Sequence, residues 1–230
     1  YEQAKKVLDT VIVATDDQRI YNCVKAFGGE VVMTYPDHTC GTDRVYEAYQ
    51  HYCATSSVIV IPEETVVINI QGDEPFIQPD QVQALMNCFP TEIATLVHPF
   101  TKDDTLEDLI NPNYVKVAIA REHNHSNATI GHAMYFSRSV IPYIRGAEAT
   151  DWPQHEQHFR HLGMYAYRAD ILQKITQISP SPLEQLECLE QLRWLEHGLT
   201  IRVALTHHAS IGIDTPEDLQ RALKYLNNSK

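Results

Sequence analysis

The chain has 230 residues, with a hydrophobic content of 43% and a charged content of 21%, which is typical of a soluble globular domain with a buried core. Its formal net charge of −12 argues against nucleic acid or an anionic membrane as the main partner, although a few local arginines would still bind a small anion. No apolar run approaches the roughly 20 residues that cross a bilayer. The five cysteines are odd in number and far apart, without a CxxC, which favours a reducing, cytoplasmic setting.

The first half of the chain alternates β-branched runs with amphipathic segments. Strands are expected at 11–15, 30–34 and 66–70, and helices after a cap at Asp16 or Asp17, from Thr42 and after Pro79. Alternation of this kind is typical of right-handed βαβ units. We therefore expect an α/β fold with a mostly parallel central sheet.

The second half is richer in strands. Segments 93–97, 115–120, 133–137 and 162–167 are strand-like and have few helices between them, so we expect them to pair antiparallel, at a sheet edge or as an arm toward a second subunit. Leucines at every third position predict a helix over 183–195, followed by a strand at 200–205 and a helix that begins at Thr215. Residues 1–230 are interpreted as one domain.

The strand at 66–70 is followed by Gln71-Gly72-Asp73-Glu74-Pro75, where Gly72 permits a tight turn and Pro75 ends the strand. Ligands of open α/β sheets bind at the carboxyl ends of the strands. Mg²⁺ prefers carboxylate oxygens with room left for substrate phosphates and water. Asp73 is therefore the first candidate metal ligand, with Gln71 as a polar contact beside it; the alternative is an ordinary acidic turn.

Two further loops carry polar residues at expected strand ends. In the segment 38–44, Gly41 permits close backbone approach and Arg44 offers a planar fork to a phosphate or a base edge; simple helix capping by Thr42 is equally consistent with it. In the segment 211–218, Asp214 directly precedes the expected cap at Thr215. Asp73 and Asp214 together could bind one or two Mg²⁺ ions. A P-loop, GxGxxG and GxSxG are all absent from the sequence.

Motifs along nearly the whole chain carry a family resemblance. In order, they are Val11–Asp17, Phe27–Gly29, Cys40–Arg44, Asn69–Pro75, Tyr135–Ser139, Ile141–Tyr143, His161–Gly163, Tyr165–Arg168, Ser181–Glu184 and Asp214–Leu219. Together they resemble the 3-deoxy-manno-octulosonate (Kdo) cytidylyltransferases, the CMP-Kdo synthetases of lipopolysaccharide assembly. The resemblance implies a Rossmann-like nucleotide-diphospho-sugar transferase fold, a homodimer, Mg²⁺, a cytoplasmic location, and the reaction of CTP with Kdo to give CMP-Kdo and pyrophosphate.

The same resemblance assigns roles to individual residues. It implies Asp73, Asp214 and Arg44 as catalytic residues, with the two aspartates as metal ligands. It places the following residues beside the nucleotide: Thr15, Gly41, Thr42, Asp43 and Arg44. It assigns these residues to the sugar pocket: Gln71, Arg138, His161, Tyr165, Glu190 and Gln191. The carboxylate of Kdo would suit Arg138 and His161, and its hydroxyls would suit an acceptor such as Glu190. Residues from about 113 to 167 are expected to form a dimerisation and sugar-binding extension.

The chain departs from the family pattern at two places. Cys40 stands where the family usually has Ser. The family also opens with a strand and a loop of the form P-A-R-x-x-S-x-R-x-x-x-K, and we expect roughly 25–30 such residues before Tyr1 in the organism's protein. Without that loop's cations, we expect little turnover from residues 1–230 alone. Three alternatives are a CMP-sialate synthetase-like enzyme, a non-catalytic nucleotide- or sugar-binding homologue, and a scaffolding dimer.

Overall fold

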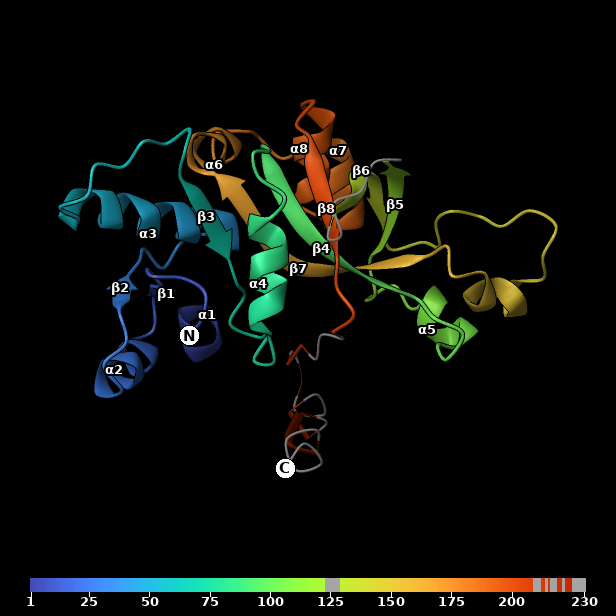
Figure 1. The fold of residues 1–230 in the computed structure, drawn as a ribbon, viewed down its shortest axis with the longest axis horizontal. Helices are drawn as coiled ribbons and strands as arrows, with labels where there is room; N and C mark the ends of the chain where they lie inside the picture. The colour runs from blue at the N-terminus through green and yellow to red at the C-terminus, as the bar shows by residue number, and fades with distance from the viewer. Residues whose placement is uncertain (123–128, 209–211, 214, 216–218, 221, 225–230) are drawn as a thin grey trace.

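Two β-sheets organise the fold (Figure 1). The computed structural model describes residues 1–122, 129–208, 212, 213, 215, 219, 220 and 222–224, and of residues 129 and 130 only the backbone. The smaller sheet pairs β1 (Val13–Thr15) in parallel with β2 (Val31–Met33). The larger sheet has the strand order β3-β7-β4-β8-β6-β5. Its strands are β3 (Val66–Asn69), β4 (Ile93–Pro99), β5 (Lys116–Arg121), β6 (Thr129–Ser137), β7 (Phe159–Arg168) and β8 (Ile201–Leu205).

The expectation of a mostly parallel central sheet is wrong at the level of strand pairing. In the described part of the six-stranded sheet β4 and β8 pair in parallel, and every other pairing is antiparallel. The cause is β7, which enters between β3 and β4 and runs antiparallel to both. Residues 164–167 are all buried, so β7 carries buried side chains on both faces, as a central strand does. The antiparallel pairing expected for the second half is confirmed, and β5 with β6 lies at the sheet edge.

Helices cover both faces of the larger sheet. The helical elements are α1 (Glu2–Lys5), α2 (Gln18–Ala26), α3 (Gly41–Thr55), α4 (Pro79–Met86), α5 (Leu106–Ile110), the 3₁₀ helix η1 (Ala149–His155), α6 (Ala169–Ile175), α7 (Pro182–Glu187) and α8 (Gln191–Glu196). Alternate β4 residues serve two cores, because successive side chains of a strand point to opposite faces. Ile93 and Val97 lie in the core that contains residues of α6 and α8, whereas Ala94 and Leu96 lie in the core that contains residues of α4.

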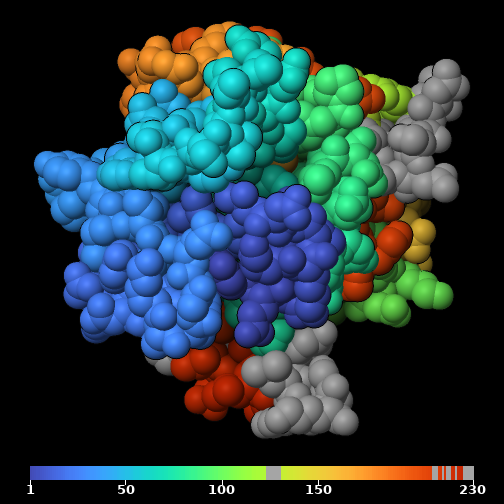
Figure 2. Space-filling model, turned by 60° about the vertical axis from the view of Figure 1, so that its left-hand side comes forward, coloured from blue at the N-terminus to red at the C-terminus, as the bar shows by residue number. Residues whose placement is uncertain are grey.

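The N-terminal residues pack on the second of these cores. Ala4 of α1 is buried in the same cluster as Val82 and Leu85 of α4. Figure 2 shows these first residues, in dark blue, lying beside the green segment that contains α4. The short α1 is therefore held by the α4 side of the molecule.

The helix expected over 183–195 is wrong as a single element. It is divided at Cys188, whose φ of 52° lies in the left-handed region, into α7 and α8. A three-residue leucine spacing drifts around a helix of 3.6 residues per turn, so one straight helix cannot bury all the leucines on one face. Leu192 is buried, whereas Leu186 of α7 remains exposed. The break places Glu190 at the start of α8.

Local helix signals agree with the structure where they are strongest. Asp17 caps α2, since its carboxylate accepts a 2.7 Å hydrogen bond from the Arg19 N–H. Pro79 occupies the first turn of α4, as expected. Of the expected C-terminal helix, the described residues show a 3.2 Å bond from the Leu219 N–H to the Thr215 carbonyl, and most of the segment lies outside the described residues.

Candidate active site

Arg44 joins the carboxyl ends of β1 and β2. Its Nη1 donates to Thr34 Oγ1 at 2.6 Å, and its Nη2 lies 2.9 Å from Asp16 Oδ2. The two strand ends are themselves linked, because the Thr34 N–H donates to the Thr15 carbonyl at 2.9 Å. Thr15 and Thr34 are buried, so this arrangement is part of the packed fold. The structure therefore brings together Thr15 and Arg44, both expected beside a nucleotide, at one edge of the small sheet.

The first turn of α3 follows the loop from β2. The helix begins at Gly41, with Cys40 as its N-cap residue and no capping hydrogen bond from that side chain. Asp43 lies in the first turn, and a side chain at Gly41 would contact Asn69 at the end of β3. The backbone N–H groups of a first helical turn lack partners within the helix, and they favour anionic ligands. The start of α3 is thus suited to phosphate and lies next to β3.

Thr42 does not cap α3, as the simple alternative would require. Its hydroxyl donates instead to Glu190 Oε2 at 2.8 Å, at the start of α8. Glu190 also pairs with Arg193, one helical turn further on. Burial, together with the charge of Glu190, raises the pKa of the Cys40 thiol to about 12, so this thiol stays protonated. The bond between Thr42 and Glu190 therefore puts a residue expected beside the nucleotide in direct contact with one expected in the sugar pocket.

The loop after β3 carries Gln71 and Asp73. The Asp73 carbonyl accepts a 2.9 Å hydrogen bond from the Ile213 N–H, which brings the segment before Asp214 to this loop. Asp214 itself lies outside the described residues. Gly72 has open space where a side chain would stand and is not among the glycines with a positive φ, so the turn does not depend on a left-handed glycine here.

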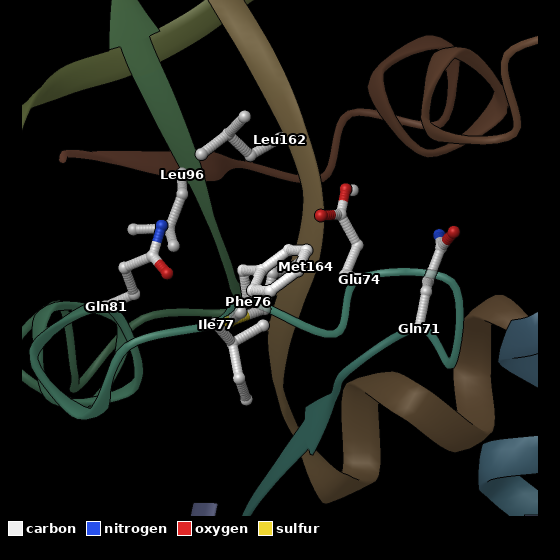
Figure 3. Close-up of a pocket in the computed structure, with 9 residues that line it drawn as sticks. Gln71, Glu74, Phe76, Ile77, Gln81, Leu96, Leu162 and Met164 are labelled. Carbon is white, nitrogen blue, oxygen red and sulfur yellow. The ribbon is translucent and has the colours of Figure 1, made fainter. Parts of the chain in front are cut away.

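The same loop borders a pocket between α4, β4 and β7 (Figure 3). Gln71 and Glu74 line it on the loop side, Phe76 and Met164 lie next to each other below Glu74 in this view, and Leu162 of β7 lies above them. A Cβ atom added to Gly163 would lie 3.1 Å from Gln71 Nε2, a tight approach. Gln71 is therefore held against β7 at a position where the strand has no side chain.

His161 and Tyr165 belong to the same irregular part of β7. Their ring centroids are 5.2 Å apart, and His161 Nε2 lies 3.0 Å from Thr95 Oγ1 of β4. Burial lowers the pKa of His161 to about 3, so the imidazole is neutral near pH 7. Burial also raises the pKa of Tyr165, whose ring meets Trp194 of α8 edge-on at 5.2 Å.

Three of the expected site residues carry buried polar atoms that lack a partner in the described part of the chain. They are Asp73 Oδ1, the Tyr165 hydroxyl and Gln191 Nε2. Buried polar atoms in folded proteins are nearly always hydrogen-bonded, so unpaired ones call for an explanation. They lie on the β3 loop, β7 and α8, and a polar ligand at the candidate site would supply their missing hydrogen-bond partners.

Arg138 lies beside the break between α7 and α8. Its guanidinium donates to the carbonyls of Pro112 at 3.0 Å, Glu187 at 2.7 Å and Cys188 at 3.4 Å. The Glu187 carboxylate in turn accepts from the Arg138 N–H at 2.9 Å and from Ser137 Oγ at 2.6 Å. Arg138 thus holds the turn that leads to Glu190, and the described hydrogen bonds place its guanidinium on backbone carbonyls.

The described residues contain no group of three or more histidines, cysteines, aspartates or glutamates arranged to hold a metal ion. Asp73 is the described member of the expected aspartate pair, and its buried Oδ1 lacks a hydrogen-bond donor in the described chain. An unpaired buried carboxylate oxygen suits a hard cation such as Mg²⁺. The hydrogen bond from the Ile213 N–H to the Asp73 carbonyl brings the chain before Asp214 to the same residue. The donor set present therefore fits a site completed from outside the described residues.

Comparison with known proteins shows the family to which the chain belongs. A family model described as cytidylyltransferase matches residues 1–201. A 3-deoxy-manno-octulosonate cytidylyltransferase of Parabacteroides distasonis is 54% identical over 99% of this chain and 86% of its own length. One of Phocaeicola vulgatus is 50% identical over 98% of this chain and 84% of its own length. This chain belongs to the 3-deoxy-manno-octulosonate cytidylyltransferase family.

The fold follows the family as well. A solved CMP:2-keto-3-deoxy-manno-octonic acid synthetase complexed with CTP superimposes with a TM-score of 0.80 at 35% identity, covering 100% of this chain and 86% of that one. The chain is accordingly a nucleotidyltransferase with the nucleotide-diphospho-sugar transferase-like α/β fold. Among the described residues, no helix is both long and apolar enough to cross a membrane.

Reasoning from the sequence missed residues that organise this candidate site. Asp16 and Thr34 hold Arg44, and Thr95 contacts His161. Thr95 left a signal, because it is the one polar residue in the run Ile93-Ala94-Thr95-Leu96-Val97. A polar residue in a strand that is apolar on both faces needs a specific partner. Asp16 and Thr34 gave no comparable signal, since polar residues after strands are common.

Proposed function

We propose that this protein transfers the cytidylyl group of CTP to Kdo, giving CMP-Kdo and pyrophosphate. The whole-chain identity to relatives named 3-deoxy-manno-octulosonate cytidylyltransferase is the observation that carries the proposal. The contact between Thr42 and Glu190 supports it, because it joins the expected nucleotide and sugar sides at 2.8 Å. Transfer between two substrates needs both to be held in one geometry.

In this proposal CTP lies along the start of α3 and the ends of β1 and β2. The residues assigned to it are Thr15, Gly41, Thr42, Asp43 and Arg44. The first-turn N–H groups of α3 and the Arg44 guanidinium supply the positive potential that a nucleotide phosphate requires. Support comes from the CTP complex of the solved relative at 35% identity.

Kdo lies on the other side of Glu190, against β7. The residues assigned to it are Gln71, Arg138, His161, Tyr165, Glu190 and Gln191. The unpaired Tyr165 hydroxyl and Gln191 Nε2 support this assignment, since both can bond sugar oxygens. Glu190 accepts from Thr42 and from Arg193, and a carboxylate has further lone pairs for a sugar hydroxyl.

Asp73, together with Asp214, would hold Mg²⁺. When bound, that ion would lower the pKa of the attacking hydroxyl and offset charge on the leaving pyrophosphate. The chain's own groups do the positioning. The start of α3 and Arg44 orient the triphosphate, while Gln71 and the β7 residues present the anomeric hydroxyl of Kdo to the α-phosphorus.

Three wider features belong to the same proposal. Residues from about 113 to 167 form an extension for dimerisation and sugar binding, supported by the edge position of β5 and β6. Activation of Kdo serves lipopolysaccharide synthesis. Because CTP is a cytoplasmic metabolite and the cysteine pattern favours a reducing compartment, the enzyme works in the cytoplasm.

The testing experiment is pyrophosphate release by the full-length protein with CTP, Mg²⁺ and a panel of acid sugars that includes Kdo and a sialic acid. Release with Kdo alone is the expected result. Pyrophosphate release with the sialic acid and not with Kdo would show that the proposed sugar substrate is wrong. If no sugar gives pyrophosphate release although CTP binding is measurable, the protein is a non-catalytic homologue.

A further inference from the structure

Thr95 is a polar residue in the middle of the apolar strand β4. It is completely buried, between Ala94 and Leu96, which each contribute to the core that packs on α4. Its hydroxyl oxygen lies 2.9 Å from the Met164 carbonyl oxygen, 3.4 Å from the Leu162 carbonyl oxygen and 3.0 Å from His161 Nε2. A buried hydroxyl costs free energy unless it is hydrogen-bonded, so these contacts explain why Thr is tolerated there.

The contacts to Thr95 favour one direction of hydrogen bonding. A threonine hydroxyl carries one proton, and carbonyl oxygens can only accept. The shortest carbonyl contact is to Met164, so the Thr95 proton is used there. His161 Nε2, at 3.0 Å from the same oxygen, must then carry a proton and donate it. The opposite ring nitrogen, Nδ1, is left with the free lone pair.

The same hydroxyl fixes the irregularity in β7. Thr95 pairs with Tyr165 in the register between β4 and β7, but the next residue, Leu96, pairs with Leu162. Gly163 and Met164 are therefore extra residues on β7, and such bulges re-aim side chains next to active sites. By bonding the Met164 carbonyl, Thr95 holds the bulge that carries His161 on one side and Tyr165 on the other.

The surroundings of His161 keep the ring uncharged. Its ring centroid lies 5.2 Å from that of Phe136 and 5.2 Å from that of Tyr165. Burial among these groups lowers the pKa of His161 to about 3. A neutral imidazole lacks the charge that would favour a sugar carboxylate, and an Nδ1 without a proton cannot donate to one.

We propose that Thr95 is a positioning residue that holds His161 as the neutral Nε2–H tautomer, so that Nδ1 accepts a hydrogen bond from a hydroxyl group of the acid sugar. The inference rests on the proposed function in that it takes the sugar to lie at His161. It differs from the simpler expectation that His161 binds the sugar carboxylate. An acceptor matched to a sugar hydroxyl also supplies selectivity, since an analogue without that hydroxyl leaves the acceptor unpaired.

The tautomer is tested directly by ¹⁵N NMR of histidine-labelled full-length protein near neutral pH, without substrates. His161→Gln identifies the His161 signals by their disappearance. The expected spectrum has a protonated Nε2 and an unprotonated Nδ1 in wild type and in Thr95→Ser, and loses this single tautomer in Thr95→Val. Protonation at Nδ1 in wild type would overturn the inference, whatever the enzyme's activity.

Steady-state kinetics test the consequence. Losing one neutral hydrogen bond corresponds to about a tenfold effect, so Thr95→Val should raise the KM for Kdo about tenfold while the KM for CTP stays within about twofold. Thr95→Ser should restore the wild-type KM. Thr176→Val is the matched control, because it removes an exposed hydroxyl that donates to the Gln173 carbonyl just before it in the chain.

Failure of this inference is separable from failure of the proposed function. A Thr95→Val enzyme whose KM for Kdo is unchanged would overturn the positioning role, even with full activity on Kdo. An equal rise in the KM for both substrates would also overturn it, because it would indicate general loosening of the sheet. If Thr95→Val does not fold, the wild-type and Thr95→Ser spectra still decide the tautomer. If His161 has the expected tautomer but the protein is inactive on every acid sugar, the proposed function is wrong and the tautomer assignment stands.

Discussion

Thr42 and Glu190 lie 148 positions apart in the sequence, and a 2.8 Å hydrogen bond joins their side chains. Thr42 is the second residue of α3, and Glu190 is the N-cap residue of α8, beyond the break at Cys188. The bond is partly buried, so water competes for it only weakly. It fixes the distance between the two halves of the proposed site, and the positions of both substrates should depend on it.

Removing this bond should weaken the binding of both substrates together. We expect Thr42→Val to raise the KM for CTP and the KM for Kdo, each by about fivefold to tenfold, since one hydrogen bond to a charged group is lost. Thr42→Ser, which keeps the hydroxyl, should stay close to wild type. Steady-state kinetics with each substrate varied in turn will measure this. An effect confined to CTP would show that the contact does not couple the two sides.

Asp73 should matter for the reaction and not for stability. We expect Asp73→Asn to lower kcat by at least about 10²-fold, the usual loss when a charge-stabilising group is removed. Because Oδ1 lacks a hydrogen-bond donor in the described chain, the free energy of unfolding without substrates should not fall.

The matched control for Asp73 is Asp80→Asn. Asp80 lies in the first turn of α4 and forms an exposed 2.7 Å ion pair with His208, a kind of pair that contributes little. Pyrophosphate release and a Mg²⁺ titration will compare the two variants. Equal activity in both variants, with unchanged Mg²⁺ dependence, would remove Asp73 from the proposed metal site.

Glu47 of α3 fixes the loop that leads from β2 to the start of that helix. Its carboxylate accepts from the Tyr35 N–H at 2.9 Å and contacts His38. Burial by itself would raise the pKa of Glu47, but the bonds from Tyr35 and His38 outweigh it and hold the pKa below the ordinary value of 4.5. A lowered carboxylate pKa stabilises the fold above the unfolded-state pKa, and this stabilisation is lost as the pH falls through the folded-state value.

Glu47→Gln should therefore lower the free energy of unfolding by about 1 kcal/mol near neutral pH. The difference from wild type should shrink as the pH falls below 4.5. Urea unfolding across this pH range will measure it, with the exposed Glu64→Gln as the control variant. A difference of constant size at every pH would mean that the carboxylate charge plays no part.

A side chain at position 163 should displace the Gln71 amide. An alanine Cβ there would lie 3.1 Å from Gln71 Nε2, so the amide must shift by a few tenths of an ångström. We expect Gly163→Ala to raise the KM for Kdo roughly twofold to tenfold, since small displacements of positioning groups are costly. Gly72→Ala is the control, because open space surrounds that position. An identical KM for Kdo in both variants would show that Gln71 does not bind the sugar.

Local sequence signals determined the parts of this protein that depend on near neighbours. The β-branched runs, a helix cap at Asp16 or Asp17 and the acidic loop after β3 were all predicted from short segments, because strand burial, capping and turn chemistry act within a few residues. The family's motifs then indicated which polar residues to group. The spacing of these residues in the sequence could not show that they gather around Arg44, Glu190 and the β7 bulge.

Tertiary contacts decided the rest. The insertion of β7 between β3 and β4 depends on pairings with strands more than 60 residues away, as in the contact of Thr95 with His161. The break at Cys188 depends on which leucines reach the core, and the bond from Thr42 to Glu190 depends on that break. Each of these features depends on how distant segments bury side chains while keeping an allowed backbone geometry. The local spacing of apolar residues does not contain that information. The sequence alone determined which residues could do the chemistry, and the packing of distant segments decided which of them meet.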